Sequence, residues 1–373
     1  MTWHTLAVAV AIGLFLFDFQ NLIAWWRGRI LPPNVRRSTD FTIVVPLYGH
    51  PRYFDDRGSL SRYQRNILIS IDVSRLIMVV FADVLEREGW RVHRTTMTKP
   101  CAPKLIADAL PHVKTTYVLR MDGDTRPVDD VERFVAAMEH ARADLCSTKV
   151  SVASPTTEAQ RFQALEYRMA MLARHFRPWL TSGACYVART TALRKILDTH
   201  SMWPPGEDME TGRIAHAFKM RIHHLDLRVE TQAPKTWRGL FNQRRLWWTG
   251  NFRHSIVNFD RNALHFPIWS LYYVGLVWVG LYFKWHSIIE HLHPLALMKA
   301  LAWLFAVYAL ITLIANWQVR SWRMLVYPPY ALAQAILMPM VGSVHYWLIV
   351  RRAGGFGRYR FPHRRSALPA ASR

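Results

Sequence analysis

Two aspartates separated by one residue are the first feature of this sequence with recognisable chemistry. Asp122 and Asp124 flank Gly123 and follow an apolar run at residues 117–119. The run is β-branched and aromatic, which predicts a buried strand, and Gly123 and Pro127 predict a turn at its end. Carboxylates at the carboxyl end of such a strand lie where open α/β sheets bind ligands. At this spacing both can share one hard divalent cation, which prefers oxygen ligands and accepts phosphate oxygens as well.

The elements that must position these carboxylates alternate in type along the chain. Strands are predicted at residues 41–45, 66–72, 91–94, 117–121, 145–152 and 185–188. Helices are predicted at residues 75–88, 104–110, 128–142 and 158–174. This alternation predicts an α/β domain with a doubly wound, mostly parallel sheet.

Charge and cysteine content narrow the function class. The 373 residues are 51% hydrophobic and carry a net charge of +22. The favoured interpretation is the positive-inside bias of a membrane protein that faces anionic lipid. Nucleic-acid binding is the rival, but no recognised motif accompanies the charge, and binding of anionic substrates stays open. The isolated Cys101, Cys146 and Cys185 form no CxxC pair and indicate reduced thiols, not a disulfide frame or a zinc site.

Four long apolar stretches predict transmembrane helices. The first, at residues 6–26, is followed by arginines and lacks the flanks of a signal peptide, so we expect a retained helix with its arginine end in the cytoplasm. Residues 266–283, 300–317 and 324–350 contain no charged side chain. We therefore expect one span within residues 1–30 and about three spans with interfacial helices within residues 262–350.

The end of the chain leaves its topology open. Pro328, Pro329 and Pro339 could divide the last apolar stretch into an interfacial piece and a span. The basic tail at residues 351–373 would lie outside if every stretch crossed once, against the usual charge rule. The predicted location is the plasma (inner) membrane, multi-pass, with the domain at residues 38–258 in the cytoplasm.

Further motifs follow the aspartate pair in a fixed order. Thr181-Ser-Gly-Ala184 precedes a predicted strand, and Gly206-Glu-Asp208 precedes a helical pattern. Gln243-Arg-Arg-Leu-Trp247 stands just before the apolar stretches. In this order the set resembles the membrane-integrated family 2 glycosyltransferases, in layout the synthases of cellulose, chitin oligosaccharide, hyaluronan and related capsules. The resemblance covers about residues 38–350 and implies a GT-A type domain at residues 38–258.

The resemblance also implies a role for individual positions. Asp208 would be the general base that deprotonates an acceptor hydroxyl, with Glu207 beside it. Asp124 and Asp122 would hold Mg2+ or Mn2+. The residues implied to bind the nucleotide-sugar are Pro46, Tyr48, Asp72, Lys104, Asp122, Gln243, Arg244, Arg245 and Trp247. Those implied to bind the acceptor are Leu180, Thr181, Ser182, Gly183 and Trp247.

The residues support this chemistry independently of the resemblance. A bound cation stabilises the charge on a departing nucleoside diphosphate, and an incoming hydroxyl needs a base within hydrogen-bond reach. By analogy with inverting hydrolysis, direct displacement assisted by one base inverts the anomeric centre. Other interpretations stay open: Asp122 could cap a turn, Asp208 could complement a helix dipole, and Lys104 could be a solvated surface lysine.

One position departs from the family pattern. The usual motif has an arginine directly before its tryptophan, and here that place is Leu246. We predict that Arg245 supplies the missing guanidinium, with Arg244 as second choice; both could instead face anionic lipid.

The expected activity is transfer from a nucleotide donor, UDP above all, to a growing polysaccharide or glycolipid, with export as a further step. The alternatives are single-sugar transfer to a lipid acceptor and a silent membrane scaffold. The expected partners are the donor, the acceptor and the bilayer but no nucleic acid, and a homo-oligomer is left open.

Overall fold

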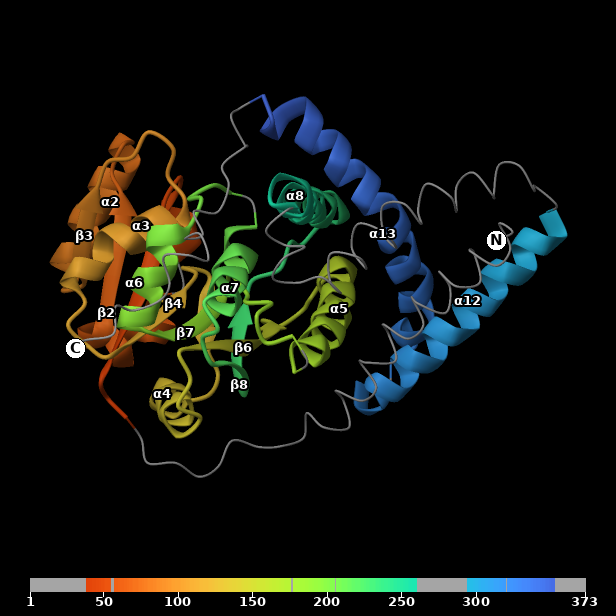
Figure 1. The fold of residues 1–373 in the computed structure, drawn as a ribbon, viewed down its shortest axis with the longest axis horizontal. Coiled ribbons are helices and arrows are strands. Elements are labelled where there is room, and N and C mark those ends of the chain that lie inside the picture. Colours follow the sequence, from red (N-terminus) through yellow and green to blue (C-terminus); the bar gives the residue numbers. More distant parts are fainter. Residues whose placement is uncertain are drawn as a thin grey trace, which may run out of the picture.

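The computed structural model describes residues 38–54, 57–175, 177–204, 206–259, 294–319 and 321–352. These residues form an α/β domain built on one sheet, and a group of longer helices extends away from it (Figure 1). The predicted spans at residues 6–26 and 266–283 lie outside the described residues.

Eight strands form a single mixed sheet in the order β3-β2-β1-β4-β7-β6-β8-β5. Their bounds are β1 Phe41–Leu47, β2 Ile67–Asp72, β3 Arg91–Thr95, β4 Tyr117–Met121, β5 Thr125–Pro127, β6 Leu145–Val152, β7 Cys185–Arg189 and β8 Ile222–Thr231. The pairs β1–β2, β1–β4, β2–β3 and β6–β8 are parallel, and β4–β7, β5–β8 and β6–β7 are antiparallel. The prediction of a mostly parallel sheet is therefore corrected to a mixed one, because strand composition does not reveal strand direction.

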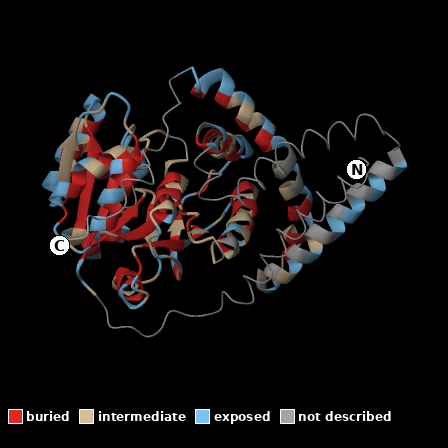
Figure 2. Ribbon diagram, in the orientation of Figure 1, coloured by how far each residue is buried: buried red, intermediate tan, exposed pale blue. Residues whose placement is uncertain are grey.

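Helices cover both faces of this sheet. The side chains of α2 (Leu76–Arg87) and α4 (Val131–His140) pack in one apolar cluster, while those of α3 (Ala102–Ala109), α6 (Thr190–Thr199) and α7 (Glu207–Ala217) pack in another. Figure 2 shows buried residues concentrated in the strands and in the helix faces turned toward them. Strands covered on both faces read as near-continuous apolar runs, as the buried β1 sequence FTIVVPL does.

Strand β1 is two residues longer than predicted. Pro46 lies inside it, buried and in register with Ser70 of β2. Proline lacks an N–H and is tolerated in sheets only where a ladder bond is not needed. The register between β1 and β4 ends at Val44, so Pro46 lies beyond that ladder.

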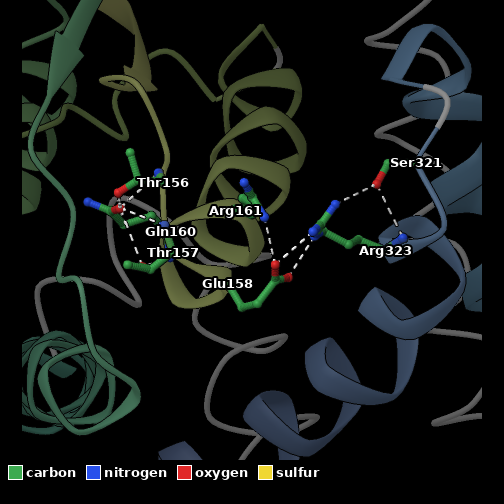
Figure 3. A network of polar contacts seen from close by, with 7 residues as sticks. All are labelled: Thr156, Thr157, Glu158, Gln160, Arg161, Ser321 and Arg323. Carbon is green, nitrogen blue, oxygen red and sulfur yellow. Dashed lines mark hydrogen bonds and ion pairs between the residues drawn. The ribbon is translucent and has the colours of Figure 1, made fainter.

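Helix α5 (Glu158–Arg174) is anchored at its first turn. Thr157 and Gln160 form a capping box: the Gln160 side-chain oxygen accepts the Thr157 N–H at 3.1 Å, and the Thr157 hydroxyl accepts the Gln160 N–H at 3.4 Å. The Gln160 amide donates to the carbonyl of Ala233 at 3.1 Å. Glu158 pairs with Arg323, at 2.6 Å to Nε and 2.7 Å to Nη2, as Figure 3 shows. The beginning of α5 is thus tied to the segment before α8 and to the beginning of α13.

The remaining helices are α8 (Trp237–Val257), α12 (Pro294–Ala315) and α13 (Arg323–His345), followed by a short π-helix (Tyr346–Val350). The three prolines of α13 lie inside the helix and do not end it. Helix α8 packs closely on α13 at Gly342. A Cβ on Gly342 would lie 2.7 Å from the backbone of Trp248, so this contact requires a glycine. Within the part of the chain that the structure describes, no helix combines the length and hydropathy needed to cross a bilayer.

Candidate active site

The predicted carboxylates lie near the carboxyl end of β4, a central strand of the sheet. Asp122 follows the last residue of β4, and its N–H donates to the carbonyl of Ala184 at 3.0 Å. That contact exists because β7 runs antiparallel to β4, with Met121 opposite Cys185, so residues 180–184 arrive beside the end of β4. The motif at Thr181 and the aspartate pair are therefore neighbours in space.

Asp124 is fixed by a second antiparallel pair. Strand β5 pairs with the end of β8, with Thr125 opposite Thr231. One carboxylate oxygen of Asp124 accepts hydrogen bonds from the Thr231 hydroxyl at 3.2 Å and the Thr125 hydroxyl at 3.4 Å. One oxygen of Asp122 pairs with Arg120 at 2.7 Å. These contacts engage the Oδ1 atom of each aspartate.

This donor set fits a hard divalent cation. Burial raises the pKa of Asp122, and the charges of Asp124, Glu207 and Asp208 raise it further. Burial also raises the pKa of Asp124 and of Glu207, the latter with a contribution from Asp208. Such crowding of negative charge favours a bound cation. Within the described ranges no three His, Cys, Asp or Glu side chains gather as ligands, so substrate oxygens would complete the shell.

Asp208 lies in the first turn of α7 and is held in a fixed orientation. Its Oδ2 accepts the N–H of Gly183 at 2.8 Å, and its Oδ1 accepts the N–H of Met209 at 2.9 Å. The Thr181 hydroxyl donates to the backbone carbonyl of Asp208. The loop that contains Trp179 and Thr181 can approach α7 closely because Gly212 has no side chain. A Cβ at Gly212 would lie 1.8 Å from the carbonyl oxygen of Trp179. Of the other predicted acceptor residues, Leu180 and Ser182 lie on the same loop, half-buried.

The predicted nucleotide-binding residues lie at the ends of the neighbouring strands. Tyr48 follows β1, and burial together with Glu207 and Asp122 raises the pKa of its phenol. Asp72, at the end of β2, is buried; its carboxylate accepts the Ser74 hydroxyl at 2.7 Å and the Met97 N–H at 3.1 Å. Asp72 therefore orders the loops after β2 and β3.

A cavity of 640 Å3 opens beside these loops and is lined by Met97, Thr98, Lys99, Lys104, Ala107, Asp108 and Met202. The Lys104 ammonium donates to the carbonyl of Lys99 at 2.8 Å. Lys104 thus lies on the wall of a cavity large enough for a nucleoside.

The motif of α8 reaches the site through an aromatic pair. Trp247 stacks on Tyr167 of α5 with ring centroids 6.2 Å apart and an interplanar angle of 13°. Asp124 is one of the charges that raise the pKa of Tyr167, after burial as the main cause, so this pair lies within electrostatic range of Asp124.

Arg244 and Arg245 point in different directions. Arg244 is buried, binds Glu166 at 2.6 Å and the Gln243 side chain at 2.7 Å, and lies 4.1 Å from the Trp247 ring centre. Its guanidinium is therefore already engaged within the protein. Arg245 lies near α13, where its charge adds to burial in lowering the pKa of His345.

Two arginines of the site were not predicted. Arg120 is buried in β4 against Asp122. Arg174, at the end of α5, donates to the carbonyl of Leu180 at 2.5 Å; burial lowers its pKa to about 10, while the charge of Asp208 opposes that shift. A charged residue inside an apolar strand was the available sequence signal for Arg120.

Comparisons with known proteins identify the family and the fold of this chain. The sequence model described as "Glycosyl transferase family group 2" matches residues 117–350, more than half of the chain. A search of curated proteins finds no match. The mannosyltransferase PcManGT from Pyrobaculum calidifontis, solved with GDP-Man and Mn2+, superposes with a TM-score of 0.61 at 13% identity and covers 93% of this chain and 99% of its own. At that identity the likeness shows the fold alone.

A second structure, S. aureus TarS 1–349 with UDP-GlcNAc, has a TM-score of 0.42 at 14% identity over 85% of this chain and 92% of its own, too low to carry an argument. The family match includes the strand before Asp122, both aspartates, Asp208 and the Trp247 motif. The chain therefore belongs to glycosyl transferase family group 2 and is a glycosyltransferase with a GT-A-like α/β fold.

Proposed function

We propose that this chain is an inverting membrane glycosyltransferase that moves a sugar from a nucleotide donor to a growing polysaccharide or a glycolipid. The observation that carries the proposal is that Asp208, hydrogen-bonded to Gly183, lies close to Asp122 and Asp124 at the carboxyl end of β4. This arrangement supports a diphosphate site with a candidate base beside it.

Asp208 is the base of the proposed reaction. An acceptor hydroxyl becomes a competent nucleophile when a carboxylate takes its proton within hydrogen-bond distance. The two backbone N–H bonds to Asp208 fix its orientation. The hydroxyl oxygen forms the new glycosidic bond as the bond from the anomeric carbon to the diphosphate breaks, so one displacement inverts the configuration.

Asp122 and Asp124 would hold Mn2+ or Mg2+, which supplies Lewis-acid stabilisation of the diphosphate leaving group. The protein fixes these two ligands with Arg120 and Thr231 respectively. UDP is the expected nucleotide, and the GDP-Man bound by the P. calidifontis enzyme makes GDP the first alternative to test.

The stacked pair of Tyr167 and Trp247 is the proposed platform for the acceptor. Aromatic faces pack well against the apolar faces of sugars, and Trp247 remains 38% exposed. The engaged Arg244 holds this platform in place through its contact with the Trp247 ring.

The proposal of membrane integration rests on the apolar sequence stretches and on the surface of the last helices. Large apolar side chains are exposed along α12 and α13, among them Leu295, Met298, Trp303, Leu310, Trp322, Leu325 and Leu337. Many large apolar side chains exposed on the same pair of helices are typical of membrane or protein contacts. The α/β domain would face the cytoplasm, where nucleotide-sugars are available. Extraction of the chain by detergent but not by alkaline carbonate supports integration, and recovery in the carbonate supernatant refutes it.

The activity is tested by nucleotide release from a panel of UDP- and GDP-sugars with Mn2+, Mg2+ or EDTA. We expect metal-dependent release with at least one donor, abolished in Asp124→Asn. Release that is identical in EDTA refutes the metal site. Product length then separates polysaccharide extension from single transfer to a lipid, and no turnover with any donor would favour the silent scaffold.

A further inference from the structure

Arg120 is a buried cation in the middle of the sheet. It lies on β4 between Val44 of β1 and Tyr186 of β7 and is 4% exposed. Its Nη2 contacts the Asp122 carboxylate at 2.7 Å, and its guanidinium lies 6.0 Å from the ring centre of Tyr186. A charge at such a position needs close counter-charges to remain in the folded state.

The second terminal nitrogen of this guanidinium lies toward the proposed base. Nη1 is buried and has no hydrogen-bond partner among the described residues. A Cβ built on Gly183 would lie 3.1 Å from Nη1 and 3.4 Å from the Asp208 carboxylate. The missing side chain of Gly183 thus leaves Arg120 and Asp208 on two sides of one small space.

The surrounding charges converge on Arg120. Asp122 pairs with its guanidinium, and Glu207 and Asp208 lie nearby. A small gap in the packing is lined by Arg120, Tyr186, Glu207, Asp208, Thr211 and three apolar residues of α3. Arg120 is therefore in contact with Asp122, a proposed metal ligand, and close to Glu207 and to Asp208, the proposed base.

We propose that Arg120 is a positioning residue that serves both halves of the site: it holds Asp122 in place and balances the charge of Glu207 and Asp208 when no metal is bound. The proposal rests on the proposed function, because it assumes that Asp122 and Asp124 take a divalent cation. Arginine suits this position, because one end of its guanidinium contacts a carboxylate while another N–H remains available to a second group.

The test measures the melting temperature of the full-length chain in detergent, with unfolding monitored by tryptophan fluorescence. Wild type, Arg120→Met and Arg120→Lys are melted in EDTA, with Mn2+ plus UDP, and with Mn2+ plus GDP. Arg189→Met is the matched control, because Arg189 lies at the opposite end of the neighbouring strand, opposite Tyr117, and 3.8 Å from Asp144.

In EDTA we expect Arg120→Met to melt at least about 5 °C below wild type, since three carboxylates lose their shared counter-charge. The rise in melting temperature on adding Mn2+ and nucleotide should be larger than in wild type, because the bound cation then supplies part of the lost balance. Arg120→Lys should show an intermediate loss and an intermediate rise. Arg189→Met should lower the melting temperature without changing the rise.

A rise in Arg120→Met equal to that of wild type overturns the role of Arg120 while leaving the proposed function intact. If Arg120→Met does not fold, Arg120→Lys decides by the same comparison. If wild type shows no rise with either nucleotide, the proposed donor site fails. Arg120 is then judged in EDTA alone, where a loss no greater than that of Arg189→Met refutes its role.

Discussion

The ion pair between Glu166 and Arg244 gives the most quantitative prediction. Arg244 is 2% exposed and Glu166 23% exposed at the side chain, and both Nε and Nη2 of Arg244 bind one oxygen of Glu166, at 3.1 Å and 2.6 Å. Removing one partner of a buried pair leaves a buried charge uncompensated, at a cost of about 3–5 kcal/mol. Because Glu166 is partly exposed, we take the lower end, about 3 kcal/mol, for Glu166→Ala.

The structure offers a matched control on the same helix. Glu158 of α5 pairs with Arg323 at the same distance, 2.6 Å, but its side chain is 43% exposed and that of Arg323 21% exposed. Exposed pairs contribute little because water screens them. Glu158→Ala should therefore leave the melting temperature almost unchanged, while Glu166→Ala should lower it by roughly 4 °C in a chain of this length.

The assay is thermal and urea unfolding of the two single variants in the same detergent, together with the pair Glu166→Leu and Arg244→Met. Replacing both charges by apolar groups removes the unpaired charge, so the double variant should recover most of the loss. Equal melting temperatures for Glu166→Ala and Glu158→Ala would refute the assignment of Arg244 as a buried anchor of Trp247.

Four further predictions concern the site and its surroundings. Asp124→Asn should abolish metal-stimulated turnover, because the cation loses a charged oxygen ligand; full activity with unchanged metal dependence contradicts it. Asp208→Asn should cost at least about a hundredfold in rate with donor binding preserved, as measured by nucleotide titration, and a joint loss of both points to a structural role. Arg245→Ala should leave turnover near wild type, because α8 turns that side chain toward α13; a strong loss would show that its guanidinium reaches the leaving diphosphate. Burial and neighbouring cations lower the pKa of His224 well below 6.5, so on acidification the unfolded state binds a proton before the folded state does. The stability that neutral His224 contributes is therefore present above pH 6.5, and the free energy of unfolding should fall by up to about 1 kcal/mol per pH unit below pH 6.5. Urea unfolding at several pH values should show a weaker slope in His224→Gln.

Elements with strong local patterns were predicted closely from sequence. The ranges 117–121, 145–152 and 158–174 agree residue for residue with β4, β6 and α5. Strand β8 was missed although Leu225, Leu227, Val229 and Thr231 alternate as buried residues along it. Two histidines just before these residues, and Asp226, Arg228 and Glu230 between them, lowered the apparent hydrophobicity of that strand.

The site was predicted in its residue types more than in its contacts. The family pattern identified Asp122, Asp124 and Asp208 from their order alone. It gave no sign that Arg244 forms an ion pair with Glu166, 78 positions earlier in the chain. It also ranked Arg245 first because of its position in the motif, whereas helix geometry turns that side chain toward α13.

The sequence by itself determined the alternation of strands and helices, the carboxylates at the end of β4 and the family to which they belong, because these depend on residues close together in the chain. Only the tertiary structure decided that β7 runs antiparallel to β4 and β8 antiparallel to β5, which brings Gly183 to Asp208 and Thr231 to Asp124. Only it decided that Arg120 is buried among three carboxylates. Strand direction and the environment of a buried charge depend on contacts between distant segments, which no local pattern of residues encodes.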